Sequence, residues 1–162
     1  MKITFIQTGG TIDKDLPKVS KGYAFEIGAP AVIKILGRIK PNFEYEIVPL
    51  LQKDSLDLNA KDREKILKAC QNAKGNKIVV THGTDTMTKT AKVLSKIKNK
   101  TIVFTGASRP EKFADSDAMF NVGAAIMAAS LLPSGVYIAM NGKVHEWSKT
   151  RKDTKTGQFV EI

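Results

Sequence analysis

The sequence alternates short, β-prone apolar runs with segments of helical periodicity, and this alternation restricts its fold more than any other feature. The apolar runs cover residues 2–8, 43–51, 77–81, 101–105 and 136–140. Helical segments begin at Pro30, which suits a first turn, at Asn59, which is a good N-cap, and at Thr84 and Ser116. Five strands that alternate with four helices predict a parallel sheet with helices on both faces.

The connections between these elements limit the topology. Right-handed crossovers favour the strand order 2-1-3-4-5. Asn141-Gly142 is a strong hairpin signal that leads into a further strand at 143–147, where we expect His145 to be exposed. Residues from 148 onward are polar and show no pattern, and no repeat or linker interrupts the chain. We therefore predict one domain over residues 1–162: a doubly wound, mostly parallel five-stranded sheet with a C-terminal hairpin.

The chain has a formal charge of +10, which raises the question of a nucleic-acid partner. Its 26 basic residues are 22 Lys and only 4 Arg, whereas Arg carries the planar fork suited to phosphates and base edges. The basic excess is densest at residues 86–112, without interleaved aromatic side chains. We interpret it as a solvated helix face and do not expect nucleic-acid binding.

Composition also restricts the compartment. No segment approaches the ~18 apolar residues that a membrane-spanning helix needs. The single cysteine, Cys70, cannot build a disulfide framework, and it lies on the apolar face of a predicted helix. No export signal precedes the first strand. We expect a cytoplasmic protein that has no membrane partner.

The predicted topology brings two loops together. Ligands of such sheets bind beyond the carboxyl ends of the strands at the switch point, here between the first and third strands. The loop after the first strand is Thr8-Gly9-Gly10-Thr11-Ile12, and the loop after the third is Thr81-His82-Gly83-Thr84-Asp85-Thr86-Met87. Both are rich in hydroxyl groups and glycine. We expect them to form one crevice, where the helix starting near Thr84 offers free N–H groups to an anion or to a developing oxyanion.

The crevice holds the groups for nucleophilic catalysis. A hydroxyl needs a partner that removes its proton, and the sequence offers Thr11 and Thr84 as hydroxyls, Asp85 as an anion and Tyr23 nearby. Lys149, which follows the hairpin, is the candidate base. Each residue also has a plain interpretation: the threonines can be helix caps and Lys149 a solvated tail lysine close to Lys152 and Lys155. His82 is better explained as a hydrogen-bonding residue behind the site than as a catalytic base.

These segments resemble those of a known family. The two loops resemble the signature motifs of the bacterial-type L-asparaginase/glutaminase family. Segment 54–58 is similar to its carboxylate-binding loop, and segment 148–150 to the segment with its lysine. Residues 106–110, followed by Ser116-Asp117 and Asn121, are similar to its segment after the fourth strand. The similarities run in order along essentially the whole chain.

The resemblance implies a role for each residue. Thr11 would attack a side-chain carboxamide, with Tyr23 hydrogen-bonded to it from a mobile lid. Thr84, Asp85 and Lys149 would handle protons. Substrate contacts would come from Ser55 for the α-carboxylate, Asp85 for the α-amino group, and Leu56, Gly83, Thr84 and Ala107 along the loops. The substrate would be L-asparagine, with L-glutamine as a second candidate, and the resemblance implies no metal or organic cofactor.

The sequence departs from the family in two ways. Family members carry a second, C-terminal domain that completes the pocket of a neighbouring subunit, and Leu56 stands where many members have a polar residue. We therefore expect a homodimer or higher homo-oligomer. Two alternatives remain open: a non-catalytic module that binds an amino acid or amide, and an amidase subunit that supplies ammonia to a larger, tRNA-linked assembly.

Overall fold

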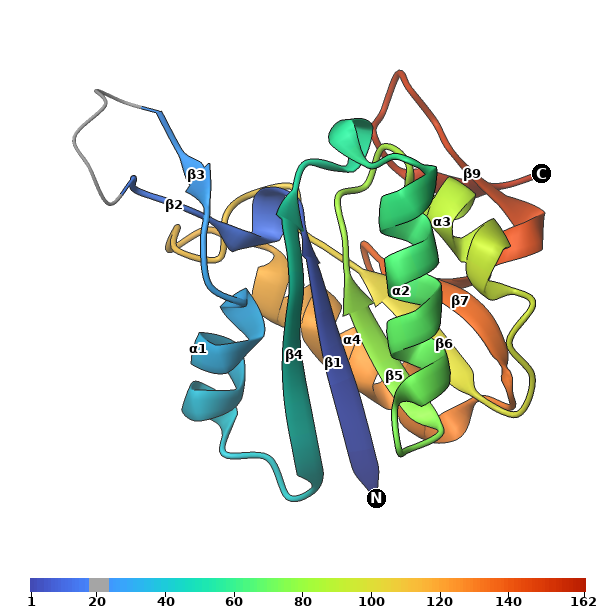
Figure 1. Cartoon of the computed structure of the whole chain (residues 1–162). Coiled ribbons are helices and arrows are strands. Elements are labelled where there is room, and N and C mark those ends of the chain that lie inside the picture. The colour runs from blue at the N-terminus through green and yellow to red at the C-terminus, as the bar shows by residue number, and fades with distance from the viewer. Residues whose placement is uncertain (18–23) are drawn as a thin grey trace.

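The computed structural model describes residues 1–17 and 24–162 and contains a six-stranded central sheet (Figure 1). The strand order is β4 (Glu44–Lys53), β1 (Lys2–Gly9), β5 (Lys77–Thr81), β6 (Thr101–Thr105), β7 (Gly135–Met140) and β8 (Lys143–Glu146). The first five strands of this list pair in parallel, in the predicted order. β8 pairs antiparallel with β7, so the predicted count of five is one strand short. The strand after the Asn141-Gly142 turn extends the main sheet.

Two pairs of helices cover the two faces of the sheet. They are α1 (Ala31–Ile39) and α4 (Ala118–Leu131) on one face, and α2 (Ala60–Asn72) and α3 (Met87–Leu94) on the other. Successive strand residues point to opposite faces, so Val79 packs with the first pair while Ile78 and Val80 pack with the second. Strands buried on both faces explain the continuous apolar runs of the sequence.

Local signals fix the ends of several elements. Asn59 caps α2 in a capping box with Asp62, as its position predicts. Asn141 and Gly142 adopt φ values of 53° and 80°, the positive values that a tight hairpin turn requires. α3 begins only at Met87, three residues later than predicted, because residues 84–86 form a turn whose polar side chains bond outside the helix.

The C-terminal residues are more ordered than the sequence suggests. β9 (Thr150–Lys152) and β10 (Phe159–Glu161) form an antiparallel ribbon, and Phe159 is buried in the core on the side of α2 and α3. The expectation of an unpatterned tail is wrong. The expected exposure of His145 is also wrong: it is buried, whereas Cys70 is buried in the core as predicted.

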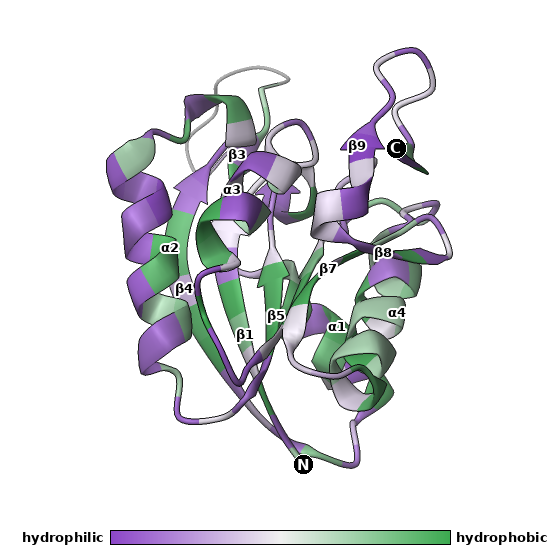
Figure 2. Ribbon diagram, turned by 90° about the vertical axis from the view of Figure 1, so that its right-hand side faces the viewer, coloured by the Kyte–Doolittle hydropathy of each residue, from purple (hydrophilic) through white to green (hydrophobic). Residues whose placement is uncertain are grey.

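The carboxyl ends of the parallel strands point towards the top of Figure 1, where the C-terminal ribbon also lies. A second small ribbon, β2 (Lys14–Asp15) with β3 (Glu26–Ile27), projects beside them. The ribbon colours of Figure 2 show α2 polar along one side, whereas α4 is largely apolar along its length. Within the described ranges, every helix is too short or too polar to cross a bilayer.

Candidate active site

The loops that follow β1 and β5 meet at the carboxyl-terminal edge of the sheet, where these two strands pair directly. Gly10 has φ +91°, and a Cβ on Gly10 would lie 2.5 Å from the backbone nitrogen of Gly83. Glycine tolerates both the backbone conformation and the close approach. The next residues along the two loops, Thr11 and Thr84, therefore lie at the same edge of the sheet, as the sequence predicts.

Ser55 lies against this pair of loops. It begins a 3-10 helix (Ser55–Asp57) after β4, and the Asp54 carboxylate caps that helix by accepting a hydrogen bond from the Leu56 nitrogen at 3.1 Å. A Cβ on Gly83 would lie 2.7 Å from the Ser55 Cβ. Ser55 is buried, and its hydroxyl has no hydrogen-bond partner in the part of the chain that the structure describes. Buried hydroxyls are normally paired, so this one is available to a ligand.

The loop after β6 forms another wall of the site. A Cβ on Gly106 would lie 2.5 Å from the His82 carbonyl oxygen, and Ala107 is buried beside it. Asn121 of α4 holds the loop by donating a hydrogen bond to the Gly106 carbonyl at 3.0 Å. The loop also reaches the turn after β1, because the Glu111 nitrogen donates to the Ile12 carbonyl at 3.1 Å. The three loops thus form one connected rim.

Lys152 supplies the cation of the site. Its Nζ donates to the Thr84 hydroxyl oxygen at 2.8 Å and to Asp85 Oδ1 at 2.5 Å. The ammonium is largely covered, with 22% of the side chain exposed, whereas the Asp85 side chain is 48% exposed. The β9–β10 ribbon places Lys152 there, over the turn that precedes α3.

The prediction that Lys149 reaches the site is wrong. Lys149 lies in the 3-10 helix (Trp147–Lys149) before β9, with 71% of its side chain exposed. Its Nζ donates to the Glu146 carboxylate at 2.7 Å, which raises the pKa of Lys149. Thr150 and Lys152 are two positions apart in β9, so their side chains point to the same face of the ribbon. On that face the Thr150 hydroxyl donates a hydrogen bond to the Val160 carbonyl. Lys149 precedes the strand, and its side chain points to Glu146 at the surface.

The predicted residues can now be placed. The structure brings to one edge of the sheet the loops that carry Thr11, Ser55, Gly83, Thr84, Asp85 and Ala107. The side chain of Leu56 is 70% exposed beside Ser55. Tyr23 lies outside the described residues. Lys152 is the residue that sequence reasoning missed. The signal in the sequence was a possible β-hairpin, in which Thr150–Lys152 pairs with the segment around Phe159 across a turn at Gly157.

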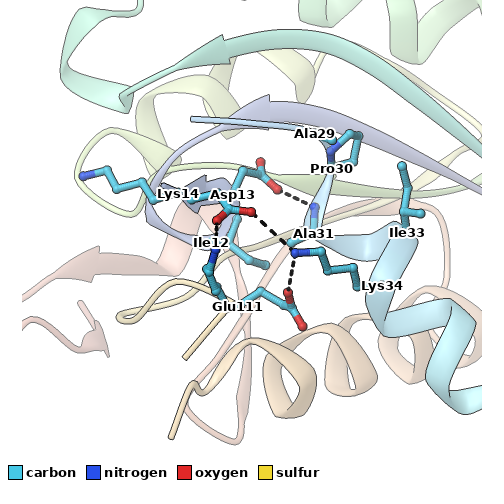
Figure 3. A pocket seen from close by; sticks show the side chains of 11 residues that line it. Ile12, Asp13, Lys14, Ala29, Pro30, Ala31, Ile33, Lys34 and Glu111 are labelled. Atoms are coloured by element: carbon cyan, nitrogen blue, oxygen red, sulfur yellow. Dashed lines mark hydrogen bonds and ion pairs between the residues drawn. The ribbon is translucent and has the colours of Figure 1, made fainter. Parts of the chain in front are cut away.

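A small cavity of about 100 Å³ lies next to the turn that carries Thr11 (Figure 3). Asp13 lines it: one carboxylate oxygen accepts a hydrogen bond from the Ala31 nitrogen at 2.7 Å, and the other has no partner among the described residues. Burial raises the pKa of Asp13 to about 7. Across the cavity the buried Glu111 pairs with Arg38. Asp13 thereby ties the Thr11 turn to the start of α1.

The arrangement suits acyl chemistry carried by protein groups. A hydroxyl-bearing turn, a lysine–carboxylate pair and a buried, unpaired serine hydroxyl lie at one edge of the sheet. In the ranges that the structure describes, no cluster of three or more His, Cys, Asp or Glu side chains is arranged to hold a metal ion.

Comparison with known proteins adds to this geometry. Residues 2–159 match the family model described as asparaginase, N-terminal. An L-asparaginase from Thermococcus kodakarensis is 33% identical over 150 residues, which covers 89% of this chain and 45% of that protein. The solved structure of the thermostable L-asparaginase from the same organism superposes with a TM-score of 0.86 at 30% identity, over all of this chain and 51% of the other.

Two further relatives differ in their described roles. One subunit of a glutamyl-tRNA(Gln) amidotransferase from Methanococcus vannielii is 42% identical over 84 residues, which covers 46% of this chain and 20% of that protein. A probable periplasmic L-asparaginase from Haemophilus influenzae is 32% identical over 153 residues, or 88% of this chain and 43% of that protein. Because one relative is described as periplasmic, similarity to these proteins does not fix the compartment. The chain spans about half the length of the asparaginases that it matches.

Proposed function

The chain belongs to the asparaginase family through a match to its N-terminal domain, and on this premise we propose that it is an amidohydrolase that releases ammonia from the side-chain carboxamide of L-asparagine. L-Glutamine is the second substrate to test. The observation that carries the proposal is the Lys152 ammonium bonded to both Thr84 and Asp85, on the loop that packs against Gly10 and therefore beside Thr11.

In this proposal Thr11 is the nucleophile. Its oxygen attacks the carboxamide carbon, the carbon–nitrogen bond breaks, and water then hydrolyses the acyl-enzyme to aspartate. Because the Thr84 hydroxyl accepts a hydrogen bond from Lys152, its own proton is free to pass to the departing nitrogen. Lys152 replaces that proton, and the proton that Thr11 gives up on attack restores the Lys152 ammonium, so the proton count balances; Asp85 keeps the lysine in place.

The remaining groups bind the substrate. The unpaired hydroxyl of Ser55 is suited to the α-carboxylate, and the exposed Asp85 to the α-amino group. Backbone groups of Thr84 and Ala107 are the candidates for contact with the oxyanion and the amide nitrogen. Tyr23 is proposed to contact Thr11 from the segment outside the described residues.

Ammonia release from asparagine and glutamine tests the proposal, with the Thr11→Ala protein as the control. We expect ammonia from the wild-type protein and at least a hundredfold slower release from Thr11→Ala. Equal rates for the two proteins would contradict the proposal. Stabilisation by L-aspartate without any turnover would instead indicate the non-catalytic binding module.

A second candidate function is an ammonia-supplying subunit of a tRNA-linked assembly. The 42% identity to a glutamyl-tRNA(Gln) amidotransferase chain favours it, and the charge of +10 suits a partner that carries nucleic acid. This function predicts RNA retention at low salt that falls steeply as salt is raised. Absence of retention at low salt would remove it.

We also propose that the site is completed by a second copy of this chain. The ground for this proposal is the family resemblance, which implies a pocket that a neighbouring subunit closes. The uncharged helix α4 offers exposed apolar side chains for this contact.

A further inference from the structure

Arg63 is a buried cation that forms no ion pair with any described residue. It lies in the first turns of α2, with 5% of its surface exposed. Its guanidinium donates to the Leu58 carbonyl at 2.6 Å, to the Thr86 hydroxyl at 3.0 Å and to the Thr90 hydroxyl at 3.2 Å. Burying a charge without an opposite charge costs free energy, so these hydrogen bonds must carry out a task that an apolar side chain would not.

The direction of each hydrogen bond follows from the donors. Arginine only donates, so the hydroxyl oxygens of Thr86 and Thr90 both accept from it, and their own protons point onward. The Thr86 hydroxyl donates a hydrogen bond to the Ser55 carbonyl oxygen at 2.7 Å. Thr90 lies 2.8 Å from His82 Nε2, a shorter distance than the 3.4 Å to the Thr86 carbonyl.

His82 continues the second branch. Its Nδ1 lies 2.6 Å from the Gly83 carbonyl oxygen, which only accepts, so Nδ1 carries a proton. Burial, together with the nearby charge of Arg63, lowers the pKa of His82 to about 4, so the ring is neutral near pH 7. Its Nε2 therefore accepts a hydrogen bond from the Thr90 hydroxyl. Both branches start on Arg63 and end on carbonyl groups, one of Ser55 and one of Gly83.

These two carbonyl groups belong to the loops that build the site. A trans peptide directs its C=O and N–H in opposite directions. When His82 holds the Gly83 carbonyl, the N–H of Thr84 points away from His82, and no described group accepts a hydrogen bond from it. The other branch holds the loop of Ser55, whose side chain packs on Gly83.

We propose that Arg63 is a positioning residue of the active site, which orients the Thr84 N–H through Thr90 and His82 and holds the Ser55 loop through Thr86. The inference rests on the proposed function, because it assigns the Thr84 N–H to the oxyanion and Ser55 to the substrate carboxylate. The two branches therefore have different consequences: one affects the chemical step and the other affects substrate binding.

Kinetics of single threonine variants test this division. Thr90→Val frees the Gly83–Thr84 peptide and is expected to lower kcat about tenfold or more with little change in KM, since an oxyanion donor acts in the transition state. Thr86→Val loosens the Ser55 loop and is expected to raise KM with kcat nearly unchanged. Thr4→Val is the matched control, because Thr4 is buried in β1 and its hydroxyl has no partner among the described residues. Equal effects of Thr86→Val and Thr90→Val would overturn the proposal.

Arg63→Met removes both branches and is expected to change kcat and KM together. If this variant does not fold, the two nearly isosteric threonine variants still decide the question. Wild-type kinetic values in folded Arg63→Met protein would contradict the inference.

A spectroscopic measurement separates this inference from the proposed function. In ¹⁵N-histidine-labelled protein, with His145→Gln for assignment, His82 is expected to be the neutral Nδ1–H tautomer near pH 7 and to remain neutral down to about pH 5. The Nε2 signal should shift in Thr90→Val and Arg63→Met but not in Thr86→Val. An Nε2–H tautomer in the wild type would overturn the network. The expected signals together with absent turnover would leave the network standing and reject the proposed hydrolase.

Discussion

The ammonium group of Lys152 lies 2.8 Å from the hydroxyl oxygen of Thr84, although 68 positions separate these residues in the sequence. In the proposed mechanism this contact supplies the proton donor. Lys152→Met keeps the length of the side chain and removes the charge, so we expect kcat for ammonia release to fall by about 10²–10⁴-fold, the usual contribution of a positioned acid or base.

Lys149→Met is the matched control for this prediction. Lys149 pairs with Glu146 at the surface, so the variant is expected to keep kcat within a factor of about two of the wild type, because exposed ion pairs contribute little. Steady-state ammonia release with both variants provides the measurement. A larger loss in Lys149→Met than in Lys152→Met would return the role to Lys149.

Gly83 is the contact point between the hydroxyl-bearing loop and Ser55. A methyl group at this position would lie 2.7 Å from the Ser55 Cβ, so Gly83→Ala must push the Ser55 loop outward. We expect a loss of about 1–3 kcal/mol in the free energy of unfolding, typical of overpacking, together with a raised KM. Urea denaturation and steady-state kinetics measure the two effects.

Gly37→Ala is the control for added methyl groups. Gly37 lies inside α1, and a methyl group added there would have no atom of the described residues within 4 Å beyond its own helix backbone and chain neighbours. Alanine there should stabilise the protein by about 0.5–1 kcal/mol, because glycine is unfavourable inside a helix. Destabilisation of both variants to the same extent would show that the Ser55 contact is not the cause.

The sequence predicted the central sheet well because its inner strands are buried on both faces. Residues 77–81 and 101–105 are continuous apolar runs with few alternatives, and the structure places strands β5 and β6 at these positions. The close approach of the loops after β1 and β5 followed from topology, since adjacent parallel strands end at the same edge.

The position of Lys152 could not be predicted in the same way. β9 and β10 have three residues each, too few to show a reliable alternation, and most of their side chains are polar. Phe159 anchors the ribbon through contacts with helices that are distant in the sequence. The start of α3 was misplaced for a related reason: Thr86 bonds to Ser55 and Arg63, and neither contact is visible in the local pattern.

The α4 helix is expected to form the contact between two copies of the chain. Residues 118–131 carry no charge, whereas the chain has a net charge of +10, so two copies repel each other least at this face. Phe120, Met127 and Leu131 are exposed along it. We expect light scattering at micromolar concentration to give about twice the 17.7 kDa of one chain.

Met127→Glu tests this surface by placing a charge in the contact, which should produce monomers, because a charge buried without a partner strongly disfavours association. Ile33→Glu is the control, since Ile33 is an exposed apolar residue on a different helix. A wild-type protein with the mass of a single chain would reject the dimer. Monomers from both variants would place the contact elsewhere.

Asp13 predicts an unusual pH dependence of stability. Burial raises its pKa from 3.8 to about 7, so between these values the folded protein keeps a proton that the unfolded chain has lost. The contribution of Asp13 to stability is therefore fully present below about pH 4 and is lost progressively as the pH rises to about 7. Above that pH, the titration of Asp13 no longer changes the stability. Asp13→Asn cannot titrate but keeps an oxygen for the Ala31 nitrogen. Relative to the wild type, the variant should gain stability across this window, by on the order of 2–4 kcal/mol at pH 8.

Urea denaturation of both proteins from pH 4.5 to pH 8.5 measures this difference. Asp15→Asn is the control, because a hydrogen bond from Lys112 lowers the pKa of Asp15, and its titration lies below this range. Parallel stability curves for Asp13→Asn and the wild type would show that Asp13 is ionised in the folded protein throughout.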